Sequence, residues 1–295
     1  MNYRDEVFLQ VAELLNISKA AERLFISQPA VTKHIQEMEN KLDMPLFERK
    51  GNRIYLTRAG KITFNHLKSI KQQYQELEFE LNQINNTYKG NLRIGASSTI
   101  TQYVIPPVIA AFHARYPDIK LSLLNGNSED MTHKLLNNEI DLVLVENQGT
   151  HQNIHYIDFM DDEIFAVTNP ESLYARRRQV TNEELPQTPM VLRETGSGTL
   201  EVIKKAFSTN NMRFDEMNII LQLGSTEAIK NFLSDFEGIS FISEKAVKKE
   251  INRKELVKIK TPSLSITRRF RIGLRQGPEM KLTRLFTDYL INYNF

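Results

Sequence analysis

The stretch that decides the fold of this chain is SKAAERLFISQPAVTKHIQEME, residues 18–39. It predicts two short helices joined by a tight turn at residues 25–27. In the second helix, Val31, Ile35 and Met38 recur at i, i+4 and i+7, which is the spacing of one buried helical face. The stretch therefore predicts a compact helical hairpin, with the other side of its second helix exposed to solvent.

Capping residues are placed on both sides of the turn. Ser18 is placed to cap the first helix and Ser27 the second, and Pro29 falls in a first turn, where a missing N–H costs little. The second helix then presents polar groups outward, and such a helix can read base edges in a DNA major groove. A plain solvated hairpin is the alternative. The residues expected to face DNA are Ser27, Gln28, Pro29, Ala30, Thr32, Lys33 and Gln36.

The composition is that of an ordinary globular protein of two or three domains, with 295 residues, 41% hydrophobic and 25% charged. There is no cysteine, which excludes disulfides and thiolate chemistry. The charged start MNYRDEVFLQ does not fit a signal peptide, and no long apolar run follows, so a cytoplasmic protein without a membrane partner is predicted. The net charge is only +2, so a DNA surface must come from the placement of cations.

A basic turn follows the helical hairpin. Residues 48–53 read ERKGNR, and residues 54–56 (IYL) form a short extended run. A Gly-Asn pair between extended pieces indicates a β-hairpin. Beside a helix-turn-helix, this hairpin would be a wing that lays Arg49, Lys50 and Arg53 along phosphates or a minor groove. Taken alone, a charged turn of this kind is usually only solvated.

Residues 8–60 resemble the DNA-binding domain of LysR-type transcriptional regulators. The resemblance rests on FLQVAE (8–13), on the unbroken run from SKAAERLF to LFERK (18–50), and on RIYLTRAG (53–60). It implies a winged helix-turn-helix with the helix of residues 27–38 in the major groove. Many relatives carry a hydroxyl residue or arginine followed by glutamine where this chain has Lys33-His34, so the base sequence that it reads is not carried over.

A long helix is predicted from Arg58 to Ile84, with Thr57 as its cap. Its apolar residues recur with a period of 3.5, the pattern of a coiled-coil seam, while its other faces are rich in Gln, Glu and Lys. A dimer built on this seam would hold two recognition helices at the spacing of two half-sites. Packing of part of the helix along the chain's own later domain is the alternative. The predicted seam residues are Leu67, Ile70, Tyr74, Leu77, Leu81 and Ile84.

Strand and helix patterns alternate after a polar linker. This alternation predicts an α/β domain with a mostly parallel sheet, in which the chain crosses between two lobes near Asp161 and returns near Arg268. The resemblance implies the same, an effector domain with the fold of periplasmic solute-binding proteins and a ligand cleft between lobes. The predicted divisions are a winged helix-turn-helix (1–57), a linker and dimerisation helix (58–86), a hinge (87–91), effector lobe I (92–161 and 268–295) and effector lobe II (162–267).

Small polar residues follow four of the predicted strands, at residues 95–99, 126–128, 195–199 and 224–226. Each group precedes a helix, so N–H groups and hydroxyls would face one cleft and could bind an anion. Helix capping alone is the alternative. The resemblance carries over Ser98, Thr99, Asn127 and Ser197 as effector-binding residues. Glu237 stands where relatives more often have a Gly-Leu-Gly segment, which leaves the charge of the pocket open.

Signatures of enzymes and metal sites are weak. Residues 196–198 (GSG) lack the frame of a nucleophile elbow, and neither a Walker loop nor a dinucleotide fingerprint follows a strand. His151 and His155 lie four residues apart near Asp158, but Asn153-Ile154 between them favours a loop over a metal site. No catalytic residue, cofactor or metal is therefore expected.

The sequence thus predicts a LysR-type regulator that binds an interrupted palindrome in double-stranded DNA as a dimer or a dimer of dimers. A small, anionic effector would change its conformation. RNA polymerase is a further candidate partner. The alternatives are an enzyme or solute-binding domain on a DNA tether, and a regulator whose cleft is vestigial. Residues 95–119 most resemble LysR-type members that govern sulfur assimilation or carbon fixation.

Overall fold

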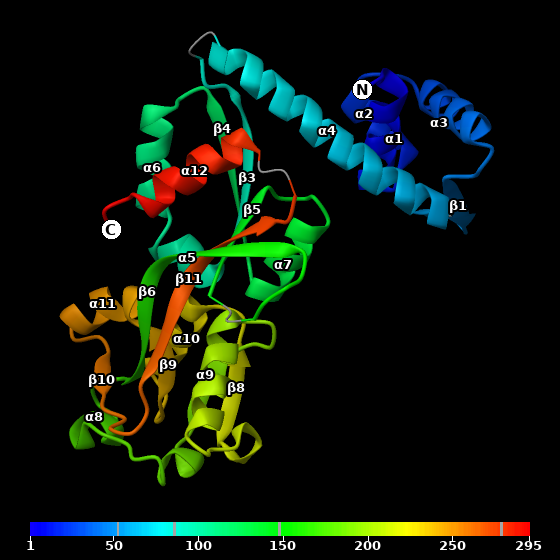
Figure 1. Ribbon diagram of the computed structural model, residues 1–295. Helices are drawn as coiled ribbons and strands as arrows, with labels where there is room; N and C mark the ends of the chain where they lie inside the picture. The colour runs from blue at the N-terminus through cyan, green and yellow to red at the C-terminus, as the bar shows by residue number, and fades with distance from the viewer. Residues whose placement is uncertain (52, 85–86, 147–148, 278–279) are drawn as a thin grey trace. The chain divides into compact units, whose positions relative to one another are not determined.

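The computed structural model describes residues 1–51, 53–84, 87–146, 149–277 and 280–295. By their internal contacts the residues form two compact units, Met1–Gly90 and Asn91–Phe295 (Figure 1). None of the described helices is both long and apolar enough to cross a membrane.

Three helices form the core of the first unit: α1 (Tyr3–Leu14), α2 (Ile17–Leu24) and α3 (Gln28–Leu42). Phe8 and Val11 of α1 are fully buried, as is Val31 of α3, and they belong to one apolar cluster with Ala20 and Ala21 of α2. The small alanine side chains allow the close approach of neighbouring helices. The predicted buried face of the second hairpin helix is confirmed.

The turn between α2 and α3 also has the predicted form. Phe25 ends α2 in the left-handed conformation, with φ of 55°. Ser27 begins α3, and its side chain accepts a hydrogen bond from the Ala30 N–H at 3.3 Å. Pro29 lies in the first turn, where its missing N–H removes no helical bond.

The prediction that Ser18 caps α2 is wrong. Asn16 is the cap, and its side-chain oxygen accepts from the Lys19 N–H at 3.0 Å. Asn16 has the extended backbone that a cap requires, whereas Ser18 already lies inside the helix. The Ser18 hydroxyl instead accepts a hydrogen bond from the Gln28 side chain at 2.7 Å, which ties α2 to α3.

The basic hairpin is confirmed. Strand β1 (Phe47–Lys50) pairs antiparallel with β2 (Arg53–Leu56), and Lys50 lies opposite Arg53. The turn residue Asn52 lies outside the described residues. The carboxylate of Glu39 on α3 accepts from the N–H groups of Leu46 and Phe47 at 2.7 and 3.1 Å. These bonds fix the start of the hairpin to the recognition helix.

Helix α4 (Arg58–Ile84) has 27 residues, and its predicted bounds are confirmed. Thr57 caps it, since its hydroxyl accepts from the Gly60 N–H at 3.0 Å. Gly60 lies so close to the preceding loop that an added Cβ would be 2.0 Å from the carbonyl oxygen of Leu46. The first turn of α4 is therefore packed tightly onto the start of the hairpin. Of the predicted linker, Asn85 and Asn86 lie outside the described residues.

The strands of the second unit form a mixed sheet. The long strands β6 (Ile154–Thr168) and β11 (Ile266–Arg275) pair antiparallel with each other, and β11 is also antiparallel to β5 (Leu142–Val145). Strand β3 (Gly90–Ser97) is parallel to β5. The expectation of a mostly parallel sheet is wrong, because both crossing strands run antiparallel to their neighbours. The remaining strands are β4 (Ile119–Gly126), β7 (Met190–Arg193), β8 (Ile219–Leu223), β9 (Ser240–Ser243) and β10 (Val257–Ile259).

Strands β6 and β11 run through both halves of the second unit (Figure 1). We call lobe I the half built on β3, β4 and β5, and lobe II the half that contains β7 to β10. The helices of lobe I are α5 (Ser98–Tyr103), α6 (Pro106–Arg115), α7 (Ser128–Leu136) and α12 (Lys281–Ile291). Those of lobe II are α8 (Leu173–Arg177), α9 (Gly198–Thr209), α10 (Thr226–Leu233) and α11 (Glu244–Asn252), with short 3-10 turns at Leu185–Gln187 and Phe214–Glu216.

Each lobe has its own apolar packing. In lobe I, the rings of Phe112 on α6 and Phe286 on α12 meet edge to face at 5.0 Å, and both side chains are fully buried. In lobe II, Phe207 on α9 packs against Phe241 on β9 at 5.6 Å. Each lobe therefore has buried aromatic contacts of its own. Of the predicted crossing residues, Asp161 lies in β6 and Arg268 lies in β11, the two strands that join the lobes.

Candidate functional site

The polar face of α3 is solvent-exposed, as the DNA-reading prediction requires. Gln28, Lys33 and Gln36 are exposed, while Thr32 is half-buried at the edge of the face. His34 lies on another side, where its ring meets the Tyr3 ring edge-on at 5.5 Å. Of the other residues predicted to face DNA, Ser27 and Pro29 are exposed and Ala30 is half-buried.

The cations of the wing are available to a partner. Arg49, Lys50 and Arg53 are all exposed on the β1–β2 hairpin. Lys50 forms an exposed ion pair with Glu48 at 3.0 Å, a contact that solvent weakens and that phosphate can replace. The hairpin can therefore supply positive charge beside α3 although the net charge of the first unit is small.

A row of exposed apolar side chains runs along α4. Ile70, Tyr74, Leu77, Leu81 and Ile84 are 39, 49, 52, 53 and 76% exposed. Exposed apolar residues in a row of this spacing are typical of a helix that pairs with another helix.

Leu67 was predicted to lie in the seam, but it is buried within its own unit. Its side chain is only 8% exposed and belongs to the apolar cluster of α1, α2 and α3. The start of α4 lies against those helices, so Leu67 serves the core of its own unit. The exposed row therefore begins at Ile70.

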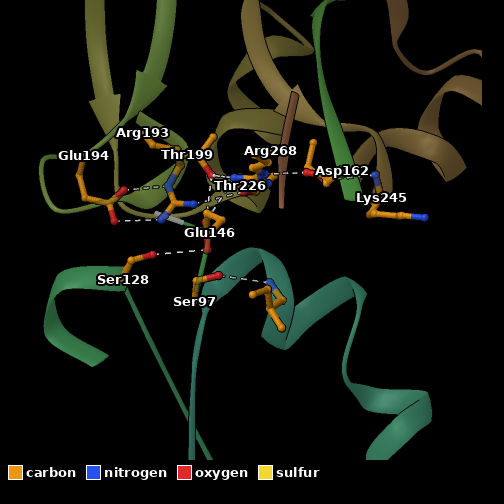
Figure 2. Close-up of polar contacts among 12 residues, drawn as sticks. Ser97, Ser128, Glu146, Asp162, Arg193, Glu194, Thr199, Thr226, Lys245 and Arg268 are labelled. Carbon is orange, nitrogen blue, oxygen red and sulfur yellow. Dashed lines mark hydrogen bonds and ion pairs between the residues drawn. The ribbon is translucent and has the colours of Figure 1, made fainter. Parts of the chain in front are cut away.

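The predicted effector residues lie where strands of the two lobes end and helices begin. Ser98 and Thr99 start α5 after β3 and are 4 and 1% exposed. Asn127 precedes α7 after β4, and Ser197 precedes α9 after β7, with Ser197 at 1% exposure. Ser98, Thr99 and Ser197 are therefore buried at strand-to-helix junctions of the two lobes, while Asn127 is half-buried. Figure 2 shows polar residues next to these junctions, among them Ser97 and Ser128 of lobe I and Thr199 of lobe II.

Helix capping accounts for only some of these hydroxyl and amide groups. Asn127 caps α7 by accepting from the Asp130 N–H at 2.8 Å, and Ser97, next to Ser98, caps α5 by accepting from Ile100. In contrast, the buried hydroxyls of Ser98 and Ser197 have no hydrogen-bond partner among the residues that the structure describes. Buried hydroxyls are normally paired, so these two are candidate ligand contacts.

A carboxylate that the sequence reasoning missed lies at the centre of this region. Glu146 follows β5 and is 1% exposed. It accepts hydrogen bonds from Ser128 of lobe I at 3.4 Å and from Thr199 of lobe II at 3.1 Å, and it lies 3.4 Å from Arg268 on β11 (Figure 2). Glu146 therefore bridges the lobes. The available signal was a lone acidic residue directly after the buried run LVLV.

Two charged pairs flank Glu146. The guanidinium of Arg268 donates to Asp162 on β6 at 2.7 Å and to the Thr199 hydroxyl at 2.8 Å. In lobe II, Arg193 is 3% exposed and binds the carboxylate of Glu194 with two hydrogen bonds, at 2.8 and 2.9 Å. Such pairing offsets part of the cost of burying the two guanidinium groups.

Further contacts between the lobes lie beside the centre. The Glu129 N–H of lobe I donates to the carbonyl of Gly196 in lobe II at 3.2 Å. On another side, the Tyr103 phenol of lobe I donates to the Glu227 carboxylate, and the Lys230 ammonium lies 5.0 Å from its ring. Burial and the bond to Glu227 raise the pKa of Tyr103, so its phenol remains a neutral donor.

The structure also places Glu237 and the two histidines noted in the sequence. Glu237 accepts from the Ser172 hydroxyl at 2.9 Å and from the Leu173 N–H at 2.7 Å, so its charge serves the start of α8. His155 lies on β6 rather than in the predicted loop, and His151 is exposed before that strand. No group of three or more His, Cys, Asp or Glu residues that could hold a metal ion occurs in the described part of the chain.

Family comparisons match both units. Residues 5–61 match the model for the bacterial regulatory helix-turn-helix protein of the lysR family, and residues 85–294 match the LysR substrate binding domain. The chain belongs to the LysR family of transcriptional regulators. The predicted family and the predicted fold, a DNA-binding helix-turn-helix followed by a two-lobe α/β effector domain, are thereby confirmed.

Similar proteins include transcriptional regulators, one of them named for RuBisCO, and a solved regulatory domain. The transcriptional activator CmpR of Synechocystis is 28% identical over 98% of this chain and 94% of its own length. A probable RuBisCO transcriptional regulator of Thalassiosira pseudonana is 30% identical over 97% of this chain and 94% of its own. The regulatory domain of Synechocystis CcmR in complex with 2-PG is 29% identical, with a TM-score of 0.62 over 68% of this chain and 95% of that domain.

Proposed function

We propose that this LysR regulator binds an interrupted palindrome in double-stranded DNA as a homo-oligomer, and that a small anionic metabolite bound between the lobes modulates the binding. The observation that carries the first part is the exposed polar face of α3 beside a wing with exposed Arg49, Lys50 and Arg53. Gln28, Thr32, Lys33 and Gln36 would read base edges, while the wing cations would contact phosphates.

Oligomerisation would use the exposed row of α4 from Ile70 to Ile84. Two DNA-binding units held in this way fit two half-sites, in a dimer or in a tetramer made of two dimers. The protein would act in the cytoplasm, where its DNA is, as a regulator and not as an enzyme, with RNA polymerase as a further partner. The domain boundaries 1–57, 58–86, 87–91, 92–161 with 268–295, and 162–267 serve as working divisions for truncations.

The effector proposal rests on the buried hydroxyls of Ser98 and Ser197, one from each lobe, together with Thr99 and Asn127 at neighbouring strand ends. Hydroxyl and N–H donors at helix starts suit an anion. A ligand held by both lobes would bias their closure, and this bias couples ligand binding to DNA binding. The similar CcmR regulatory domain was solved in complex with 2-PG, which supports a small-molecule effector here as well.

Replacing Ser197 by alanine tests the effector site. Because its hydroxyl makes no internal hydrogen bond among the described residues, Ser197→Ala should leave the melting temperature unchanged. It should weaken a bound acid by about 1.5–3 kcal/mol, the contribution of a hydrogen bond to a charged group. The measurement is the binding of 2-PG, sulfate and phosphate to the full chain, followed by thermal shift and by the response of DNA binding.

The matched control is Ser97→Ala. This change removes the cap of α5 and should cost about 1 kcal/mol of stability without moving the midpoint of the acid titration. A Ser197→Ala protein with reduced stability and an unaltered midpoint would leave Ser197 a purely structural role. A wild-type chain whose DNA binding responds to no metabolite would contradict the effector function itself.

A further inference from the structure

Two buried carboxylates between the lobes share one guanidinium group. Glu146 and Asp162 both pair with Arg268, and the side chains of all three are at most 1% exposed (Figure 2). Arg268 is bound to Asp162 at 2.7 Å, whereas Arg193 is bound at 2.8 Å to Glu194, whose side chain is 26% exposed. The carboxylate of Glu146 lies 3.4 Å from the same Arg268 guanidinium. Among the described residues, Glu146 therefore has one ion-pair partner, which it shares with Asp162.

The surroundings of Glu146 supply hydrogen bonds, but among the described residues only Arg268 forms an ion pair with it. The donors from Ser128 and Thr199 are neutral hydroxyls. Lys245, which Figure 2 also shows, takes part through its backbone N–H to Ser243, while its side chain is exposed. A buried carboxylate without a full counter-charge is costly. The group that best complements this position is a positively charged nitrogen.

Donors without partners lie in the same region. The Ser98 hydroxyl, the Ser197 hydroxyl and the Nη2 of Arg268 are buried, and none has a hydrogen-bond partner among the described residues. Ser197 also precedes the 12-residue helix α9, and among the described residues no side chain caps that helix at Ser197, so its first turn suits an acid. The interlobe centre thus offers one acceptor for a cation and several donors for an anion.

We propose that the effector of the interlobe site is a zwitterion of the amino-acid type. Its ammonium group pairs with Glu146, and its acid group takes hydrogen bonds from Ser98, Ser197 and the start of α9. The inference rests on the proposed effector function and specifies the ligand: an acid that lacks the amino group adds no second ion pair to Glu146. Glu146 is then the residue that selects amino acids over their hydroxy-acid counterparts.

Matched ligand pairs test this selection. Serine and glycerate, aspartate and malate, and O-phosphoserine and 3-phosphoglycerate differ only by an ammonium in place of a hydroxyl. Binding to the full chain is measured by calorimetry and by thermal shift. At least one amino acid should bind about tenfold or more tightly than its hydroxy-acid partner. Only the ammonium group makes a charge-assisted hydrogen bond with Glu146. Glu146→Gln, which keeps the shape and removes the charge, should abolish that ratio.

The control is Glu129→Gln, which neutralises an exposed carboxylate on α7 at the edge of the cleft and keeps the backbone bond to Gly196. It should leave the ratio unchanged, and melting curves of both variants report folding. Should Glu146→Gln not fold, Glu146→Asp, which keeps the charge, should retain the ratio. Equal binding within every pair, or tighter binding of the hydroxy acids, overturns the inference while the effector function stands. Binding of no acid of either kind contradicts both.

Discussion

Replacing Arg268 by methionine should lower the free energy of unfolding of the second unit by about 3–5 kcal/mol, the loss expected when one partner of a buried ion pair is removed. Methionine fills a similar volume but leaves Asp162 and Glu146 buried without a positive neighbour. The hydroxyl of Thr199 would lose a donor as well. Asp162 and Arg268 both have fully buried side chains, so water cannot replace the lost guanidinium.

Calorimetry of the full chain measures this effect. For a unit of this size, the melting temperature should fall by roughly 6–20 °C, at about 2–4 °C for each kcal/mol. The matched control is Arg269→Met, the next residue, whose side chain is 65% exposed and pairs with Asp158 and Asp161 in solvent. It should leave the melting temperature nearly unchanged. Equal melting temperatures for the two variants would mean that Arg268 does not hold the buried centre together.

Leu77→Asp should dissociate the oligomer and reduce affinity for a DNA duplex with two half-sites by about 10²–10⁴-fold, the gain that linked binding provides. Leu77 lies in the middle of the exposed row of α4, where a partner helix would bury the new carboxylate without a counter-charge. Sedimentation should show a lighter species, and affinity for a duplex with one half-site should change little.

The control for this change is Gln73→Asp, which adds the same charge at an exposed polar position of the same helix. It should preserve both mass and affinity. An unchanged mass for Leu77→Asp would show that the row from Ile70 to Ile84 does not hold the oligomer together.

The first unit could be predicted closely because its signals are local. The spacing of Val31, Ile35 and Met38 places them on one face of α3, and Ser27 and Thr57 cap helices through bonds that span three residues. The misplaced cap at Ser18 arose because Asn16, two residues earlier, is an equally good cap. The burial of Leu67 could not be predicted from the apolar spacing along α4. The same row of apolar residues is buried in the core at Leu67 and exposed from Ile70 onward.

The centre of the second unit could be predicted only in part. Strand ends followed by Ser and Thr indicated the loops of Ser98 and Ser197, because strand-to-helix junctions are visible in the sequence. The partnership of Asp162 with Arg268 joins residues 106 positions apart. It depends on the antiparallel pairing of β6 with β11, a register that hydrophobic pattern alone does not specify. The contact of Glu146 with Arg268 depends on the same long-range pairing of strands.

The central claim is that the exposed face of α3 reads DNA sequence. Its most direct test begins with duplexes selected from a random pool by the full chain, whose single-base variants are then ranked by affinity for wild type, Gln28→Ala and Arg53→Ala. Gln28→Ala should lose about 1–3 kcal/mol of discrimination at one position of each half-site. Arg53→Ala should weaken all duplexes alike and reduce the salt slope by about 1. If Gln28→Ala ranked every variant as the wild type does, α3 would not be the helix that reads the bases.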